Sequence, residues 1–191
     1  MRLDQDAAWL PPLPIEQERA ERLIREDGRR RYLRSHAALR SILAKYTDVP
    51  LEFSLGQHGK PYLSSSPELN FNLSHSSERA LIAFSRDVEV GVDIERLRPL
   101  ERCLDLAERF FPPADFESLS EVPPEGREAA FFERWTVIEA KLKARGIGLY
   151  GAGADLDGEW SVSPVPVDAN YYAAVAVNCP SVSLKLHHFE P

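Results

Sequence analysis

The chain has 191 residues, of which 43% are hydrophobic and 28% are charged, and its formal net charge at pH 7 is −7. This length and composition are ordinary for a soluble globular protein and allow one ample hydrophobic core, or two small subdomains that share one. The acidic balance argues against general nucleic-acid binding, and no apolar run approaches the roughly 20 residues of a membrane-spanning helix.

The start of the chain combines an extended lead-in with helical patterning. Residues 1–14 contain three prolines and lack the apolar stretch of a signal peptide, which predicts an extended start and a cytoplasmic protein. Apolar residues recur at helical intervals from about 15 to 46, with Gly28 as the expected break between two helices. An arginine run in this stretch is typical of a solvated helix face, although in an acidic protein it can also form a local anion site. Its members are Arg19, Arg22, Arg25, Arg29, Arg30, Arg31, Arg34 and Arg40.

Short strands are expected in the remainder of the first half. They comprise a strand at 51–55, a turn at 56–61, a short extended segment at 70–73, and a hairpin of residues 80–85 with residues 88–95. In the last of these strands, apolar residues alternate with Gly91, Asp93 and Glu95. Because successive strand side chains point to opposite faces, the two acids share one face.

The second half is expected to begin with helices and to end with strands. The helices are expected at 100–111, 114–119 and 127–145, the last ended by Gly146, and the strands near 154–156, 159–165, 171–177 and 181–189. Helices and strands are mixed without strict βαβ alternation. This pattern favours an α+β fold over a doubly wound parallel sheet.

The two halves of the chain, residues 1–98 and 99–191, resemble each other in these elements. Each runs from helices into strands and closes on a small-residue apolar strand, at 80–85 and at 171–177, followed by an expected partner strand. This weak internal repeat predicts two similar α+β subdomains, related by a pseudo-two-fold axis, within one chain.

Two acidic segments about 45 residues apart contain the strongest chemical signal. Asp93 and Glu95 lie on one face of the expected strand, and Glu139 and Lys143 are four positions apart on one face of the expected helix. Together these groups can hold a hard divalent cation and a phosphate. The plainer alternatives are a solvated edge strand for the first pair and an ordinary helix ion pair for the second.

A short polar segment at 70–76 gives a second signal. Ser74 offers a hydroxyl donor and His75 an imidazole donor, which suit a phosphate. A serine-hydrolase site is disfavoured because adjacent Ser and His rarely meet as nucleophile and base, and the sequence has neither a Gly-x-Ser-x-Gly elbow nor a Walker loop. Cys103 and Cys179 lack a Cys-x-x-Cys spacing and are expected to be free thiols.

Four blocks in this order resemble the 4′-phosphopantetheinyl transferases, in their larger single-chain type named for activation of surfactin synthetase. They are His-Gly-Lys-Pro at 58–61, Phe-Asn-Leu-Ser-His-Ser at 71–76, Gly-Val-Asp-Ile-Glu at 91–95, and Trp-Thr followed by Glu-Ala-Lys-Leu-Lys within 135–143, the last block continuing to Gly146 and Gly148. The resemblance implies an active site at the junction of two similar α+β halves, in a monomer. It also implies transfer of 4′-phosphopantetheine from coenzyme A to a serine of an apo acyl, peptidyl or polyketide carrier protein, with release of adenosine 3′,5′-bisphosphate.

The resemblance further implies a metal and a catalytic set. Asp93, Glu95 and Glu139 match the acids that bind Mg²⁺, or Mn²⁺ in its place, and Lys143 matches the helix lysine that meets the pyrophosphate. Asp93, Glu139 and Lys143 are then the expected catalytic groups. Glu139, directly or through water, is our first choice to accept the proton of the carrier serine.

The remaining expected contacts are with the coenzyme A substrate. Ser74 and His75 match phosphate contacts, and Lys60 matches a lysine near the nucleotide. Arg31 and Arg40 are chosen from the arginine run for the side of the 3′-phosphate. The sequence does not identify which carrier protein is modified.

The sequence departs from the family pattern at one position. The second acidic motif usually reads Trp-Ser/Thr-x-Lys-Glu, and Ile138 occupies the lysine position here. Lys141 is three positions further along the helix and therefore points about 60° away. The departure favours one alternative, a domain that binds coenzyme A or a carrier protein without catalysis. A second alternative is a Mg²⁺-dependent nucleotide pyrophosphatase. Docking of a carrier is expected to use apolar residues such as Leu106, Phe110 and Phe116.

Overall fold

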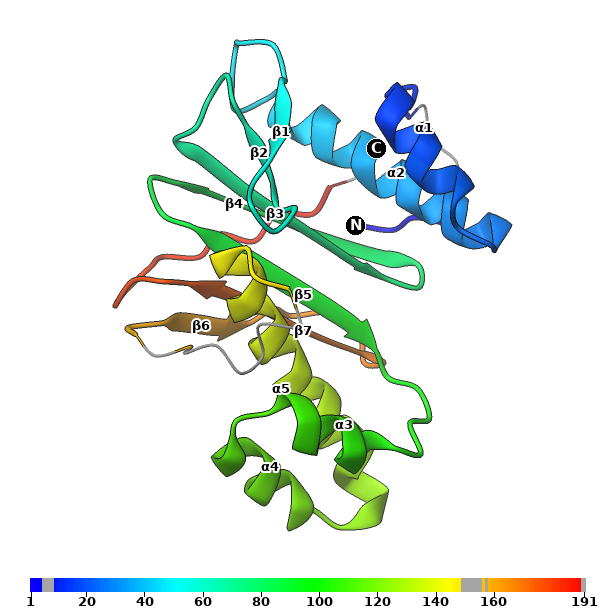
Figure 1. Cartoon of the computed structure of the whole chain (residues 1–191), viewed down its shortest axis with the longest axis vertical. Coiled ribbons are helices and arrows are strands. Elements are labelled where there is room, and N and C mark those ends of the chain that lie inside the picture. Colours follow the sequence, from blue (N-terminus) through cyan, green and yellow to red (C-terminus); the bar gives the residue numbers. More distant parts are fainter. Residues whose placement is uncertain (5–8, 149–155, 157, 190–191) are drawn as a thin grey trace.

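The computed structural model describes residues 1–4, 9–148, 156 and 158–189, a part of the chain in which helices and strands are mixed (Figure 1). The helices are α1 (Pro14–Glu21), α2 (Glu26–Leu43), α3 (Cys103–Phe110), α4 (Pro113–Ser120) and α5 (Pro124–Arg145). The strands are β1 (Phe53–Leu55), β2 (Pro61–Leu63), β3 (Leu69–Ser76), β4 (Arg79–Arg86), β5 (Val90–Arg96), β6 (Ser161–Pro164) and β7 (Tyr171–Val177). The α+β class predicted from the sequence is confirmed. None of the described helices is both long and apolar enough to cross a membrane.

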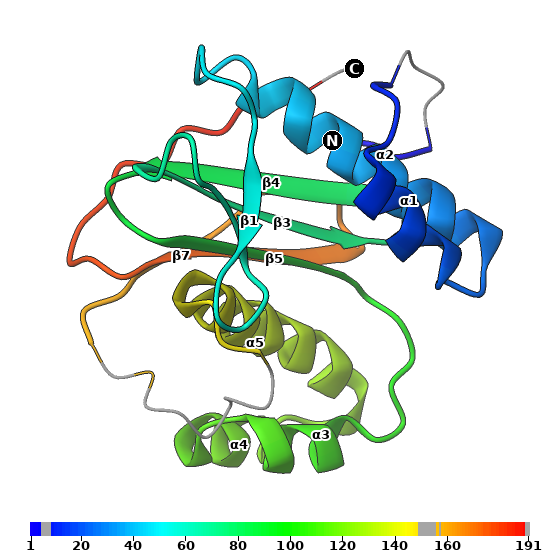
Figure 2. The same ribbon diagram turned by 45° about the horizontal axis from the view of Figure 1, so that its top comes forward.

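The strands form three antiparallel ladders. β1 pairs with β2, and β3 pairs with β4 over its whole length, from Leu69 opposite Arg86 to Ser76 opposite Arg79. β5 and β6 both pair with β7, so the strand order of this sheet is β5-β7-β6. Figure 2 shows α2 on one side of the strands and α5 on the other, so that the strands lie between two helical layers.

Polar side chains of β3 join the β3–β4 hairpin to the β5–β7–β6 sheet. The main-chain N–H groups of Val92, Ile94 and Arg96 donate to side-chain oxygens of β3, at 2.9, 3.4 and 3.1 Å, respectively. The acceptors are Asn72 Oδ1, Ser74 Oγ and Ser76 Oγ, each 20 positions earlier in the chain. The constant offset means that β3 and β5 run parallel. Side chains therefore take the place of a main-chain ladder at this seam.

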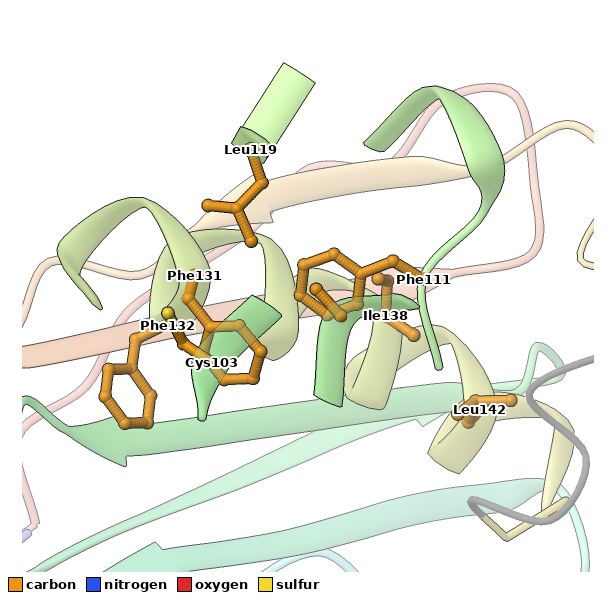
Figure 3. Packing of buried hydrophobic residues seen from close by; sticks show 8 residues of the cluster. Cys103, Phe111, Leu119, Phe131, Phe132, Ile138 and Leu142 are labelled. Atoms are coloured by element: carbon orange, nitrogen blue, oxygen red, sulfur yellow. The ribbon is translucent and has the colours of Figure 1, made fainter. Parts of the chain in front are cut away.

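α5 is the longest helix of the described chain and packs on two sides. It starts at Pro124, where the missing N–H of proline carries no penalty, and it ends at Gly146, which adopts the left-handed conformation with φ 67°. One side packs into an apolar cluster with the α3–α4 segment, in which Phe111, Phe131 and Ile138 are buried (Figure 3). Its other side faces β5 and β7.

α5 contacts β5 directly at Gly91. A Cβ atom built on Gly91 would lie 2.0 Å from the main-chain oxygen of Ala140 and 2.3 Å from the main-chain nitrogen of Ala144. No side chain fits between the helix and the strand at this point. The alternation expected for β5 is confirmed: Val92 and Ile94 are buried in an apolar cluster on one face, and Gly91 lies against α5 on the other.

We expect the Gly91→Ala substitution to destabilise the fold by about 3 kcal/mol or more, because the new methyl group would force α5 away from β5. The measurement is the free energy of unfolding from urea titration. Gly148→Ala is the matched control, since a Cβ atom there meets nothing within 4 Å. Equal stability of the two variants would show that the helix does not need this close approach.

Strand pairing differs from the sequence-based prediction. The hairpin of residues 80–85 with 88–95 is wrong, because β4 pairs with β3 and β5 pairs with β7. β3 is eight residues long, longer than the segment predicted at 70–73, and it takes up the whole ladder of β4. α5 packs closely on both β5 and its partner strand, so the partner strand must have small side chains where the helix lies. β7 provides them as Ala174 and Ala176, which pack against Ala140 of α5.

The strand predicted at 181–189 is also wrong. These residues adopt no regular secondary structure, and the alternating Val182, Leu184 and Leu186 are exposed. An alternating apolar pattern specifies a strand only where a partner edge receives it, and none of the described strands pairs with this segment. Both hairpins on which the internal repeat was based are therefore absent from the described chain. The pseudo-two-fold relation and the boundary between residues 98 and 99 stay predictions.

Smaller differences concern element ends. The break between the first two helices falls at residues 22–25, and Gly28 lies in the first turn of α2, where a glycine is tolerated. α5 begins one turn before the predicted 127, and β2 was not predicted. The strand predicted near 154–156 lies largely outside the described residues.

Candidate active site

Three segments far apart in the sequence meet at Asp93. This carboxylate on β5 is buried, with 3% of the residue surface exposed. Its Oδ1 accepts hydrogen bonds from Ser74 Oγ of β3 at 2.8 Å and from Lys143 Nζ of α5 at 2.6 Å. Lys143 Nζ also donates to Ser74 Oγ at 3.0 Å, which closes a triangle of three polar groups. The structure therefore brings together residues from three of the four motifs.

The second oxygen of Asp93 is unsatisfied. Oδ2 is buried and has no hydrogen-bond partner among the described residues. A buried carboxylate oxygen without a partner is costly, by roughly 1–3 kcal/mol or more for a charged group. Asp93 thus keeps one acceptor available for a cation.

Glu139 on α5 lies within electrostatic range of the same acids. Burial raises the pKa of Glu139; the charge of Lys143 opposes this rise, and the negative charges of Asp93 and Glu95 add to it. The carboxylates of Asp93 and Glu95 on β5 therefore repel the carboxylate of Glu139 on α5. A group whose carboxylates repel in this way is stabilised by added positive charge.

Glu95 has its own cation partner, which the sequence analysis missed. Its Oε2 accepts from Ser76 Oγ at 2.9 Å and from Arg98 NH1 at 2.7 Å. Arg98 also lies over the ring of Phe132, with its Cζ atom 4.8 Å from the ring centroid. The only available signal was the three-residue spacing between Glu95 and Arg98, which is too common to single out.

These residues fit a divalent cation in chemistry. The described residues contain no group of three or more His, Cys, Asp or Glu side chains arranged to hold a metal. Asp93 and Glu95 are instead paired with Lys143 and Arg98. The unsatisfied Oδ2 of Asp93 is nevertheless a hard oxygen donor of the kind that Mg²⁺ prefers. A cation there would also relieve the repulsion of Glu139 by Asp93 and Glu95.

Lys60 lies at a cavity next to this seam. The cavity has a volume of about 460 Å³ and is lined by the turn between β1 and β2, by the start of β3 and by the end of α5. Lys60 Nζ donates to the main-chain oxygen of Ala144 at 2.6 Å. The residues that line the cavity also include His58, Tyr62, Asn70, Glu89, Arg145 and Gly146.

His75 lies on β3 and Arg31 on α2. His75 follows Ser74 on β3 and so points to the opposite face, where its residue surface remains exposed. Partial loss of hydration lowers the pKa of His75, and the positive charges of His36, Lys143 and Arg31 lower it further. His75 therefore lies near basic side chains of α2, of which Arg31 is itself ion-paired.

The two predicted arginines differ in their surroundings. Arg31 is ion-paired with Asp27 at 3.1 Å and with Glu78. Arg40 is buried, pairs with Glu16 and donates to the main-chain oxygen of Pro11 at 2.6 Å. Arg40 thus fixes the lead-in and α1 on α2. It pairs with Glu16 and not with the acids of β5 and α5. The role of either arginine toward a phosphate stays a prediction.

Ile138 and Lys141 both point away from the acids. Ile138 is 4% exposed and belongs to the apolar cluster with α3 and α4. Lys141 Nζ lies 5.8 Å from the centroid of the Trp160 ring. Position 138 therefore serves core packing in this chain, and Lys141 does not replace the missing lysine.

Comparisons with known proteins agree with the geometry. The sequence model of the 4′-phosphopantetheinyl transferase superfamily matches residues 89–174. The chain is 36% identical to the 4′-phosphopantetheinyl transferase HetI of Nostoc sp., over 92% of this chain and 84% of that protein. It is 37% identical to the 4′-phosphopantetheinyl transferase psf-1 of Bacillus pumilus, over 64% of this chain and 53% of that protein. It is 27% identical to the 4′-phosphopantetheinyl transferase Sfp of Bacillus subtilis, over 71% of this chain and 61% of that protein.

Proposed function

The chain belongs to the 4′-phosphopantetheinyl transferase superfamily, and from this premise we propose that it transfers 4′-phosphopantetheine from coenzyme A to a serine of an apo carrier protein. Adenosine 3′,5′-bisphosphate is the second product. The observation that supports the proposal most directly is the triangle of Ser74, Asp93 and Lys143, which joins β3, β5 and α5 at one point. A transferase needs such a convergence, because its phosphate contacts and its acids must face the same reacting group.

Asp93, Glu95 and Glu139 are the residues that would hold Mg²⁺, with Mn²⁺ as an alternative ion. When bound there, the ion supplies positive charge against the pyrophosphate of coenzyme A. Asp93 supports this role with an oxygen that has no other partner among the described residues. Glu95 supports it less directly, since Arg98 already donates to one of its oxygens.

Lys143 is the proposed partner of the pyrophosphate. Its ammonium has three donors, and the structure shows two of them used by Asp93 and Ser74. In the reaction the carrier serine oxygen forms a bond to the β-phosphorus, and the bond from that phosphorus to the bridging oxygen breaks. Lys143 stabilises the negative charge that develops on the departing α-phosphate.

Glu139 is the proposed acceptor of the serine proton, directly or through water. Burial raises its pKa, and a carboxylate with a raised pKa is a stronger base. Its position on α5, one turn before Lys143, places the base and the charge-stabilising lysine on the same helix face.

The nucleotide is proposed to bind in the cavity next to Lys60. Its volume of about 460 Å³ is within the usual range for small-molecule sites. His75 and Arg31 are proposed for the phosphates, because both are partly accessible. Arg40 would have to leave its buried pair with Glu16 to take part.

The function is tested by following the release of adenosine 3′,5′-bisphosphate from coenzyme A and Mg²⁺, with and without an apo carrier protein. Transfer predicts release that requires the carrier. Release without any carrier would identify a nucleotide pyrophosphatase, and binding of coenzyme A without release would identify a non-catalytic binding domain. Which carrier is used, the monomeric state and the cytoplasmic location stay predictions.

We expect Glu139→Gln to lose transfer by about 100-fold or more while the metal-free protein becomes more stable at pH 7. Because burial raises the folded-state pKa of Glu139, its ionisation costs stability as the pH rises above the unfolded value of about 4.3. The amide removes that cost. The gain in melting temperature should therefore be present at pH 7 and vanish below about pH 4. A loss of stability at pH 7 would show that Glu139 has a structural role.

A further inference from the structure

The turn between β1 and β2 reaches across the seam to the end of α5. The turn is closed by main-chain bonds from Gly56 N to Lys60 O and from Gly59 N to Gly56 O, both 2.9 Å, and Gly59 takes φ 83°. From this turn Lys60 Nζ donates to the main-chain oxygen of Ala144 at 2.6 Å. The two partners are 84 positions apart in the sequence.

Ala144 O is a favourable site for an ammonium. It is one of the last four carbonyls of α5, which lack partners within a helix and carry the negative end of the helix dipole. Lys60 supplies both a hydrogen bond and a positive charge at this end. The carboxylate of Glu89 is a second partner of Lys60, with Glu89 Oε2 3.9 Å from Lys60 Nζ. Because Glu89 is largely exposed, it is the weaker of the two partners.

The alkyl chain of Lys60 is also fixed. A Cβ atom on Gly146 would lie 3.2 Å from Lys60 Cδ and 3.4 Å from Lys60 Cβ. The side chain of Lys60 is 17% exposed, and burial lowers its pKa, against the smaller opposite influence of Glu89. Gly146 therefore ends α5 and, at the same place, accommodates the stem of Lys60.

The turn of α5 held by Lys60 is the one that carries Lys143. Lys143 directly precedes Ala144, and its ammonium is bound to Asp93 and Ser74. A shift at the end of the helix would move Lys143 relative to both. Displacements of about 1 Å in such groups can cost roughly 100-fold in rate.

We propose that Lys60 is a positioning residue, which fixes the last turn of α5 so that Lys143 stays in place over Asp93 and Ser74. This role differs from a contact to the nucleotide, for which the ammonium would have to be available. Because Lys60 also lines the cavity, the wall of the proposed nucleotide site is mechanically joined to the reacting residues. The kinetic part of the proposal rests on the proposed transfer function, and its structural part does not.

The test uses Lys60→Met, which keeps a stem of similar length and removes the ammonium. In the substrate-free protein we expect faster hydrogen exchange at the amides of residues 144–148, with little change elsewhere. In the transfer assay we expect kcat to fall at least about tenfold and KM for coenzyme A to change much less. Lys60→Arg should restore part of both, because guanidinium can also cap a helix end.

Lys141→Met is the matched control, because Lys141 lies on the same helix over Trp160, away from the acids. It should leave exchange at residues 144–148 and kcat unchanged. A second arm combines Lys60→Met with Lys143→Met. If Lys60 acts through Lys143, it adds little further loss of kcat in that background, whereas a general structural role would add its full loss.

Two results would overturn the proposal. One is a higher KM with unchanged kcat and unchanged exchange, which would make Lys60 a substrate contact only. The other is a full additional loss of kcat in the Lys143→Met background. If the wild-type chain transfers nothing, the proposed function fails, and the exchange data with a thermal double-mutant cycle of Lys60 and Lys143 still decide the positioning role.

Discussion

Asp93→Asn is expected to reduce transfer to a carrier protein by about 1000-fold. The substitution keeps the size of the side chain and removes the charge that pairs with Lys143 and that would hold a divalent cation. Initial rates at saturating coenzyme A and Mg²⁺ measure the loss. The circular dichroism spectrum should stay that of the wild type, because the hydrogen bond from Ser74 can persist to the amide oxygen.

The control for this prediction is Asp105→Asn on α3. Asp105 forms an exposed ion pair with Arg102 and lies outside the acidic group of β5 and α5. Its substitution should leave the rate within about twofold, since such surface pairs contribute little. Wild-type activity of a well-folded Asp93→Asn protein would remove Asp93 from the reaction and with it the assignment of the metal site.

Lys143→Met is expected to lower transfer by roughly 100-fold to 1000-fold and also to destabilise the protein. The ammonium is the cation partner of a carboxylate whose side chain is only 5% exposed. Removing one partner of a buried pair costs about 3–5 kcal/mol, and the 29% exposure of Lys143 places the expected loss at or below the lower end. Urea unfolding measures the stability, and the carrier assay measures the rate.

The double variant separates the two effects of Lys143. Asp93→Asn in the Lys143→Met background removes the uncompensated charge, so most of the lost stability should return. Transfer should stay at or below the low rate of Lys143→Met, because both groups are proposed to act on the reacting phosphates. If Lys143→Met alone is as stable as the wild type, the carboxylate of Asp93 does not depend on this ion pair.

The helices and the alternation of β5 could be predicted because their signals are local. The apolar stripe and the stop at Gly146 define α5, and the period of two in β5 places Gly91 and Asp93 on one face. Pairing between strands could not be predicted in the same way. β5 pairs with β7, roughly 80 positions later, and the choice depends on which strand can admit α5. A nearby strand after a short turn looks equally suitable in the sequence.

The site was predictable to the extent that motifs name side chains. Ser74, Asp93 and Lys143 were expected from separate blocks, and the structure joins them by hydrogen bonds. Arg98 was missed because its pairing with Glu95 depends on the path of the chain after β5. A main-chain acceptor leaves no signature in the sequence, so the bond from Lys60 to the end of α5 could not be foreseen.

The structure also gives physical reasons for glycines within the motifs. Gly91 is required because the backbone of α5 touches β5, and this contact is what brings Lys143 to Asp93. Gly146 combines a left-handed helix end with room for the stem of Lys60. In the third block, Gly91 lets α5 approach the strand that carries Asp93. In the fourth block, Gly146 makes room for Lys60 beside the helix end that carries Lys143.

The most direct test of the transferase account is the intact mass of apo carrier proteins after incubation with coenzyme A, Mg²⁺ and this protein. A panel should include acyl, peptidyl and polyketide carriers. The account predicts that at least one carrier gains a single phosphopantetheine group on a serine with the wild-type chain and none with Asp93→Asn. Carriers that all remain unmodified by a folded chain that binds coenzyme A would contradict it.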